Sequence, residues 1–227
     1  MNLKTPSCSA RIFFQSTKPS YRVGRLYVNQ GMVRSMRNLL LRQALVLPLA
    51  GMLIPMVVGF FLPGYSSIHQ HMSELELQSP GIALACRAGA FISGVSIMGF
   101  AVALVVATQR RMPFTAIMAF IFGVSMVSNA VFTMGSPLHG LYAIGLSVIL
   151  VPALFVAEGN RPIERTSLVI SSLVLIYMWA LMTGLDPAAT RGLTQRLITI
   201  PMFGWFCYAS FRLLTERQSA VPKSVVA

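Results

Sequence analysis

The sequence predicts an all-α, polytopic membrane protein with six transmembrane helices and both termini in the cytoplasm. Of its 227 residues, 55% are hydrophobic and only 11% are charged, whereas soluble domains carry about 25% charged residues. The mean hydropathy of +0.70 agrees with this composition. The apolar residues also gather into six runs, each close to the roughly 20 residues that a helix needs to cross a bilayer.

The six runs form one transmembrane domain, residues 42–214. They occupy about 43–62, 82–107, 114–134, 140–157, 167–185 and 196–214. We expect each to be a helix, because backbone groups inside lipid must be satisfied within the segment itself. Four prolines lie inside the runs and predict kinks at Pro48, Pro55, Pro152 and Pro201.

The segments outside this domain are short and basic. Residues 1–41 contain no acidic residue, many Arg and Ser residues and no long apolar run, which predicts a disordered basic tail. Two other interpretations are an Arg-rich mitochondrial targeting segment and a true start at Met32 or Met36. Residues 215–227 are expected to be a short cytoplasmic tail.

The distribution of basic residues predicts the orientation. The net charge is +12, and most of the 18 Lys and Arg residues fall on one side of the six runs. Only Arg87, Arg191 and Arg196 fall on the other side. Cytoplasmic loops are enriched in Lys and Arg, so the basic side and both termini are expected to be cytoplasmic. This pattern explains the positive charge without nucleic-acid binding.

Ionisable residues gather at the end that is predicted to face outwards. The even-numbered helices begin there, and a helix N-terminus favours anions because its N–H groups and dipole carry partial positive charge. Arg87, His139 and Arg196 each lie within about two turns of such an N-terminus. A charge inside a span costs about 2.5 kcal/mol or more, so a partner is expected. Either Glu74 or Glu76 would pair with Arg87 or Arg196, or a bound anion would balance the excess positive charge.

We therefore predict a pocket for an anionic lipid headgroup or a small anionic solute near the outer leaflet. Glu74 would orient the arginines, Arg87 and Arg196 would bind the anion, and His139 would donate a hydrogen bond or shuttle a proton. The remaining ionisable residues at this end, His69, His71, Glu76 and Arg191, are interpreted as solvated surface groups.

A metal-dependent, membrane-embedded hydrolase is the enzymatic alternative. His69, His71 and His139 with the Glu74 carboxylate would hold zinc and activate water. The two-residue spacing of the HQH stretch suits a strand or an extended loop better than a helix face. The sequence contains no Gly-rich phosphate loop and no nicotinamide fingerprint, so no cofactor is expected.

A structural subunit of a membrane complex is the third possibility. Ala85, Gly89 and Ser93 recur every four residues on the second helix. This small-residue spacing lets another helix approach closely, so it indicates either packing within the chain or a homo- or hetero-oligomer through the second helix.

Three stretches resemble the bacterial and archaeal membrane family called domain of unknown function 998. They are PGYSSIHQHMSELELQSPG, the SPLHG stretch that opens the fourth helix, and the GLTQRL stretch that opens the last helix. The resemblance covers roughly 43–214 and implies six spans in a bacterial cytoplasmic (inner) membrane. The family's SEL element corresponds to 73–75, its helix-opening histidine to His139 and its last-helix arginine to Arg196. Glu76 stands where a glycine is more usual.

Overall fold

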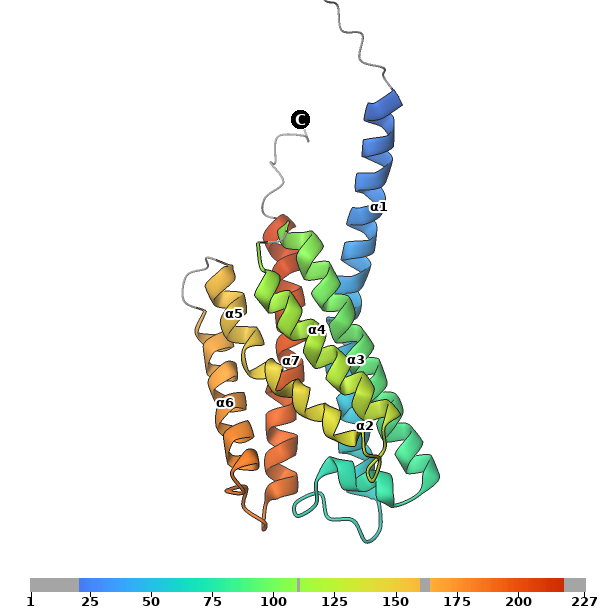
Figure 1. Cartoon of the computed structure of the whole chain (residues 1–227), viewed down its shortest axis with the longest axis vertical. Helices are drawn as coiled ribbons and strands as arrows, with labels where there is room; N and C mark the ends of the chain where they lie inside the picture. The colour runs from blue at the N-terminus through green and yellow to red at the C-terminus, as the bar shows by residue number, and fades with distance from the viewer. Residues whose placement is uncertain (1–20, 110, 160–163, 219–227) are drawn as a thin grey trace, which may run out of the picture.

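The structure, a computed structural model, describes residues 21–109, 111–159 and 164–218, and it contains no strand in these ranges. The helices follow one another as a bundle whose long elements run roughly along one axis (Figure 1). The α-helices are α1 (Tyr21–Gln43), α2 (Leu47–Phe61), α3 (Pro80–Thr108), α4 (Pro113–Val131), α5 (Val151–Glu158), α6 (Arg165–Met182) and α7 (Arg191–Gln218). The 3₁₀ helices are η1 (Met72–Leu77) and η2 (His139–Ile149).

The prediction of an all-α protein with six spans is confirmed. Six helical segments in the described part of the chain are long and apolar enough to cross a membrane: Gln30–Phe61, Pro80–Thr108, Pro113–Val131, His139–Glu158, Arg165–Met182 and Arg191–Glu216. Large apolar side chains such as Phe61, Ile176 and Trp179 are exposed on the outside of the bundle. This arrangement suits a protein whose outer surface is in contact with lipid.

The N-terminal region differs from the predicted disordered tail where the structure describes it. Residues 21–41 belong to α1, which projects beyond the rest of the bundle (Figure 1). The last turns of α1 are held by packing, because Leu41 is buried and the Gln43 side chain donates to the Ser96 carbonyl at 3.0 Å. Residues 1–20, with the rest of the predicted tail, lie outside the described residues.

The fourth span is not one uniform α-helix. It begins as η2 and continues as α5, with the change of geometry at Leu150. Pro152 lies in the first two residues of α5, where its missing N–H costs nothing. A continuous α-helix would bring the proline ring against the carbonyl of Val148. The 3₁₀ geometry rises about 2.0 Å per residue, so this short span still approaches the ~30 Å of a bilayer core.

Helix α7 contributes several of the largest buried side chains of the core. Trp205 and Phe206 are fully buried and contact aromatic rings of neighbouring helices. The ring centroids of Phe155 and Trp205 are 5.3 Å apart, and those of Phe100 and Phe206 are 5.5 Å apart. The Trp205 indole N–H also donates to Ser167 Oγ of α6 at 2.9 Å. Edge-to-face aromatic pairs add about 0.5–1.5 kcal/mol each beyond their buried area. These contacts hold the middle of α7 against its neighbouring helices.

Helix α3 is packed closely between α2 and α4 by small residues. A Cβ added at Gly89 would lie 2.3 Å from the Gly51 carbonyl oxygen, and one at Gly94 would lie 2.7 Å from the Gly123 carbonyl oxygen. Ser93 Oγ donates to the Pro48 carbonyl at 2.8 Å. The small-residue face predicted on this helix is therefore used inside the chain, and the structure does not support an oligomer through it.

Candidate functional site

The connection between α2 and α3 folds against the start of α7. We call residues 62–79 the loop cap. Arg196, one turn into α7 and only 2% exposed, holds it in place. Its Nη1 donates to the carbonyl oxygens of Ser67 at 2.8 Å and Gln70 at 3.1 Å, and its Nη2 donates to Tyr65 Oη at 2.7 Å. Burial raises the pKa of Tyr65, against the effect of Arg196, so the hydroxyl stays neutral.

The N-terminus of α7 is also occupied by the loop cap. The backbone N–H groups of Gly192 and Leu193 donate to the Ile68 carbonyl at 2.9 and 3.1 Å. The approach is close, because a Cβ added at Gly192 would lie 2.2 Å from the Gln70 carbonyl oxygen. The donors that the sequence offers to an anion at this helix start are therefore satisfied by the protein's own carbonyl groups.

Glu74 also stabilises the contact between the loop cap and α7. Its carboxylate accepts from the His71 backbone N–H at 2.9 Å in a capping box at the start of η1. It also forms an ion pair with Arg191, whose Nη2 lies 3.3 Å away. Arg191 Nε donates to the His69 carbonyl at 2.7 Å. Arg191, which we interpreted as a solvated residue, thus fastens the loop cap to α7 from the outer side.

Arg87 and His139 lie in a second group, at the end of α4. Arg87 Nε donates to the Ala130 carbonyl at 2.6 Å and its Nη2 to the Val131 carbonyl at 3.4 Å. His139 Nδ1 lies 2.8 Å from the Phe132 carbonyl oxygen. A cation at the C-terminal end of a helix is favoured by the helix dipole.

The carboxyl group that accompanies Arg87 and His139 is Glu76, which we interpreted as a surface charge. The backbone N–H of Met134 donates to this carboxyl group, and His139 and Arg87 are close enough to influence it electrostatically. Its Oε2 is buried and has no hydrogen-bond partner in the described chain. Burial raises the pKa of Glu76, although Met134, His139 and Arg87 oppose the shift.

The four predicted residues are thus engaged in two different places. Glu74 and Arg196 contact the loop cap and α7, whereas Arg87 and His139 contact the end of α4 beside Glu76. The sequence analysis considered Glu76 as a possible partner of these arginines but assigned the site to Glu74 and interpreted Glu76 as a surface group. The spacing between Glu74 and Glu76 indicates that their carboxylates face different neighbours, because residues two apart on a 3₁₀ helix with three residues per turn point to different sides.

The histidines do not form a metal site with the residues described. No group of three or more His, Cys, Asp or Glu side chains within 21–109, 111–159 and 164–218 is arranged to hold a metal ion. His71 Nε2 lies 3.7 Å from an Asp186 carboxylate oxygen, while His139 contacts the end of α4. The hydrolase alternative based on His69, His71 and His139 therefore has no support from the geometry.

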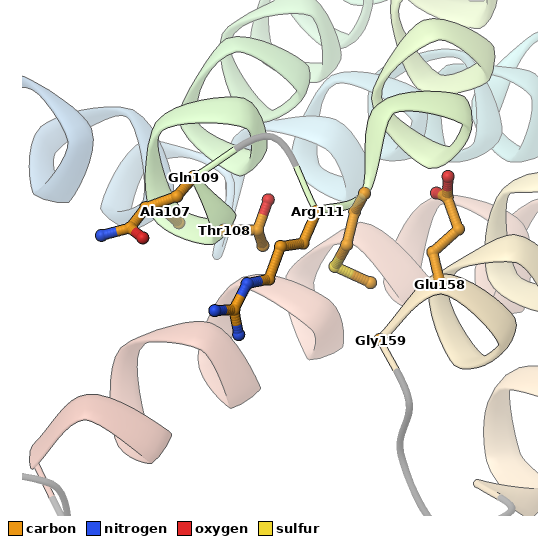
Figure 2. Close-up of a pocket in the computed structure, with 7 residues that line it drawn as sticks. Ala107, Thr108, Gln109, Arg111, Glu158 and Gly159 are labelled. Atoms are coloured by element: carbon orange, nitrogen blue, oxygen red, sulfur yellow. The ribbon is translucent and has the colours of Figure 1, made fainter.

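The opposite end of the bundle has a cavity of about 590 Å³ at the turn between α3 and α4. It is lined by Ala107, Thr108, Gln109, Arg111, Met112, Glu158 and Gly159. The Glu158 carboxylate faces α4, where it accepts from the backbone N–H groups of Phe114 at 2.9 Å and Thr115 at 2.7 Å. Figure 2 shows the Arg111 and Glu158 side chains pointing away from each other. The sequence analysis did not anticipate this cavity.

Six apolar helical spans in the described part of the chain indicate a multi-pass integral membrane protein. Residues 45–212 match the family described as Protein of unknown function (DUF998), and the chain belongs to this family. The resemblance seen in the sequence is therefore confirmed. No curated protein and no solved structure matches the chain significantly.

Proposed function

We propose that this protein binds an anionic group, either a lipid headgroup or a small anionic solute, at the loop-cap end of the membrane domain. The binding groups are Arg87 and His139, as the sequence predicts, together with Glu76. Glu74 and Arg196 build the loop cap that covers this end and do not contact the anion.

The observation that carries the proposal is the half-buried Glu76 carboxyl group, whose buried Oε2 has no hydrogen-bond partner in the described chain and which lies close enough to Arg87 to feel its charge. An ionised Glu76 neutralises the charge of Arg87 and leaves little attraction for an anion. Because burial raises the pKa of Glu76, the neutral acid is favoured over a wider pH range than in water. A neutral acid can also donate a hydrogen bond from its O–H.

Protonation of Glu76 therefore changes the net charge of the Glu76 and Arg87 pair from zero to +1. Arg87 uses Nε and Nη2 for the α4 carbonyls, and its Nη1 donates no hydrogen bond to the described residues. That nitrogen supplies a charge-assisted donor, the type of group that binds carboxylate or phosphate strongly. Anion binding is thus linked to proton uptake.

Anion-dependent stabilisation of the purified full chain tests this proposal. In an uncharged detergent, phosphate or a water-soluble carboxylate is expected to raise the melting temperature more at about pH 5.5 than at about pH 7.5, because ligand binding stabilises the folded state. Arg87→Gln is expected to abolish the increase. Arg191→Gln is the matched control, since Arg191 is an arginine of the same end that contacts only the loop cap.

Lipid and solute are distinguished by adding phosphatidylglycerol micelles instead of the soluble anion. Stabilisation by phosphatidylglycerol alone that Arg87→Gln abolishes identifies a lipid headgroup at this site, and Arg87-dependent stabilisation by both identifies a site that is open to solutes. An equal response in Arg87→Gln and in the unaltered protein, or no response at either pH, would overturn the proposal.

A further inference from the structure

We infer that the cavity at the turn between α3 and α4 is a second site, which binds the phosphate-bearing headgroup of an anionic phospholipid through Arg111. The cavity lies at the opposite end of the bundle from the loop cap and uses different residues (Figure 1, Figure 2). The inference is therefore independent of the proposed function.

The first observation is that Arg111 has no side-chain partner in the part of the chain that the structure describes. Its side chain is exposed and makes no hydrogen bond or ion pair with the described residues. Arg212, at the same end, is paired differently: its Nη1 lies 2.7 Å from Glu164 and its Nη2 lies 3.3 Å from Glu216. Arg111 thus keeps all its guanidinium donors for a ligand, and their planar fork matches a phosphate group.

The second observation is that the acidic residue of the cavity is already satisfied. Both Glu158 oxygens accept from the first turn of α4, including the Thr115 hydroxyl at 2.6 Å. The partial positive charge at a helix N-terminus offsets part of the carboxylate's negative charge and so reduces its repulsion of an anion in the cavity. The Thr108 hydroxyl donates to the Leu104 carbonyl. Among the described residues that line the cavity, Arg111 is therefore the charged donor.

The third observation favours a lipid over a free phosphate compound. An apolar groove of about 390 Å³ lies between α3 and α4 in the half of this helix pair nearest the same turn. Its lining is formed by Ala101, Val102, Val105, Pro113, Ala116, Ile117, Phe120 and Ile121. Met112 of the cavity and Pro113 of the groove are consecutive residues. A lipid has both the charged headgroup and the acyl chain that these neighbouring surfaces accommodate.

Native mass spectrometry of the full chain in an uncharged detergent tests the inference. Phosphatidylglycerol is titrated into the unaltered protein, Arg111→Gln and Arg165→Gln. Arg165 is the matched control, an exposed arginine at the start of α6 at the same end of the bundle. We expect Arg111→Gln to weaken one phosphatidylglycerol site by about tenfold, the order of a lost charge-assisted interaction. Arg165→Gln is expected to bind like the unaltered protein.

Two further measurements identify the occupant. Binding at this site is expected to be equal at about pH 5.5 and pH 7.5, because an arginine stays charged throughout, whereas binding linked to Glu76 is not. Val102→Trp, which fills the groove from an exposed position, is expected to weaken long-chain phosphatidylglycerol and spare a short-chain form. Equal binding by Arg111→Gln would overturn the inference. Displacement of the lipid by millimolar inorganic phosphate would overturn the assignment to a lipid.

Discussion

The two ends of the bundle differ in whether their arginines have hydrogen-bond partners within the protein. At the loop-cap end, Arg196 is buried and donates to Tyr65 and to three carbonyl groups, two of them in the loop cap. At the other end, Arg111 is exposed beside a cavity and has no partner in the described chain. Arg196 therefore holds the structure together, whereas Arg111 is available to bind a ligand.

The difference shows what decides the role of a charged residue near a membrane surface. A guanidinium that is buried must be surrounded by acceptors, and backbone carbonyls supply them when a loop folds over it. A guanidinium at an open cavity keeps its donors for solvent or a ligand. Both arginines lie close to helix ends in the sequence, so their position along the chain does not separate them.

The largest predicted effect compares these two arginines directly. Arg196→Met removes the guanidinium that donates to the Ser67 carbonyl and to Tyr65 Oη, and it leaves the Gln70 carbonyl with the Tyr65 hydroxyl as a donor. We expect a loss of about 3 kcal/mol or more in the free energy of unfolding. Arg111→Met is expected to change it by less than about 0.5 kcal/mol. Reversible unfolding of both variants in mixed micelles measures the difference, and similar losses in the two would contradict the comparison.

A smaller effect tests the contact between the loop cap and α7 without removing a charge. In Gly192→Ala, the new Cβ meets the Gln70 carbonyl oxygen, so the loop must shift; we expect a loss of about 1–3 kcal/mol. Gly204→Ala, on the same helix with open space around the glycine, is expected to stabilise by up to about 1 kcal/mol. Thermal unfolding of the pair in one detergent gives both values. A destabilised Gly204→Ala would show that α7 tolerates no added methyl group.

At the opposite end of the bundle, the Glu158 carboxylate caps the N-terminus of α4 and is expected to contribute to stability. Glu158→Gln removes the charge that accepts from Phe114 and Thr115, and we expect a loss of about 1 kcal/mol in stability. Glu216→Gln is the control, because the ion pair between Glu216 and Arg212 is exposed and contributes about 0–0.5 kcal/mol. Equal effects of the two substitutions in thermal unfolding would mean that Glu158 does not act as a helix cap.

The smallest effect is the pH dependence of Glu76. Its pKa in the folded protein is raised above the ordinary value of 4.5, so the folded state binds the proton more tightly than the unfolded chain. The stability that this provides is complete below about pH 4.5 and is lost as the pH rises through the raised pKa. Glu76→Gln is therefore expected to flatten the fall in melting temperature above pH 4.5. An unchanged pH profile would show that Glu76 does not titrate in this range.

Much of the fold was predictable because span formation is a local property. The six apolar runs and their approximate ends agree with the structure, since length and hydropathy alone decide whether a segment suits a bilayer. Pro152 indicated a break in the fourth span. The sequence did not reveal that the residues before it would form the 3₁₀ helix η2, because that geometry depends on packing against α4.

The candidate site was predictable only in part. The sequence analysis grouped Arg87 and His139 with Glu74 and Arg196. In the structure, Arg87 and His139 contact the end of α4, whereas Glu74 and Arg196 contact the loop cap and α7. The sequence analysis also interpreted Glu76 as a solvated group. Side-chain direction on the short helix η1 separates Glu74 from Glu76, and that direction is set by the contact of the loop cap with α7.

The sequence by itself determined that this chain is a six-span helical membrane protein of the DUF998 family, with its ionisable groups at the ends of the spans. Only the tertiary structure decided which of those groups have internal partners. Arg196 meets the Ser67 carbonyl across 129 positions of the chain. Hydropathy is summed along neighbouring residues, whereas a hydrogen bond is made by whichever acceptor the folded chain brings within reach.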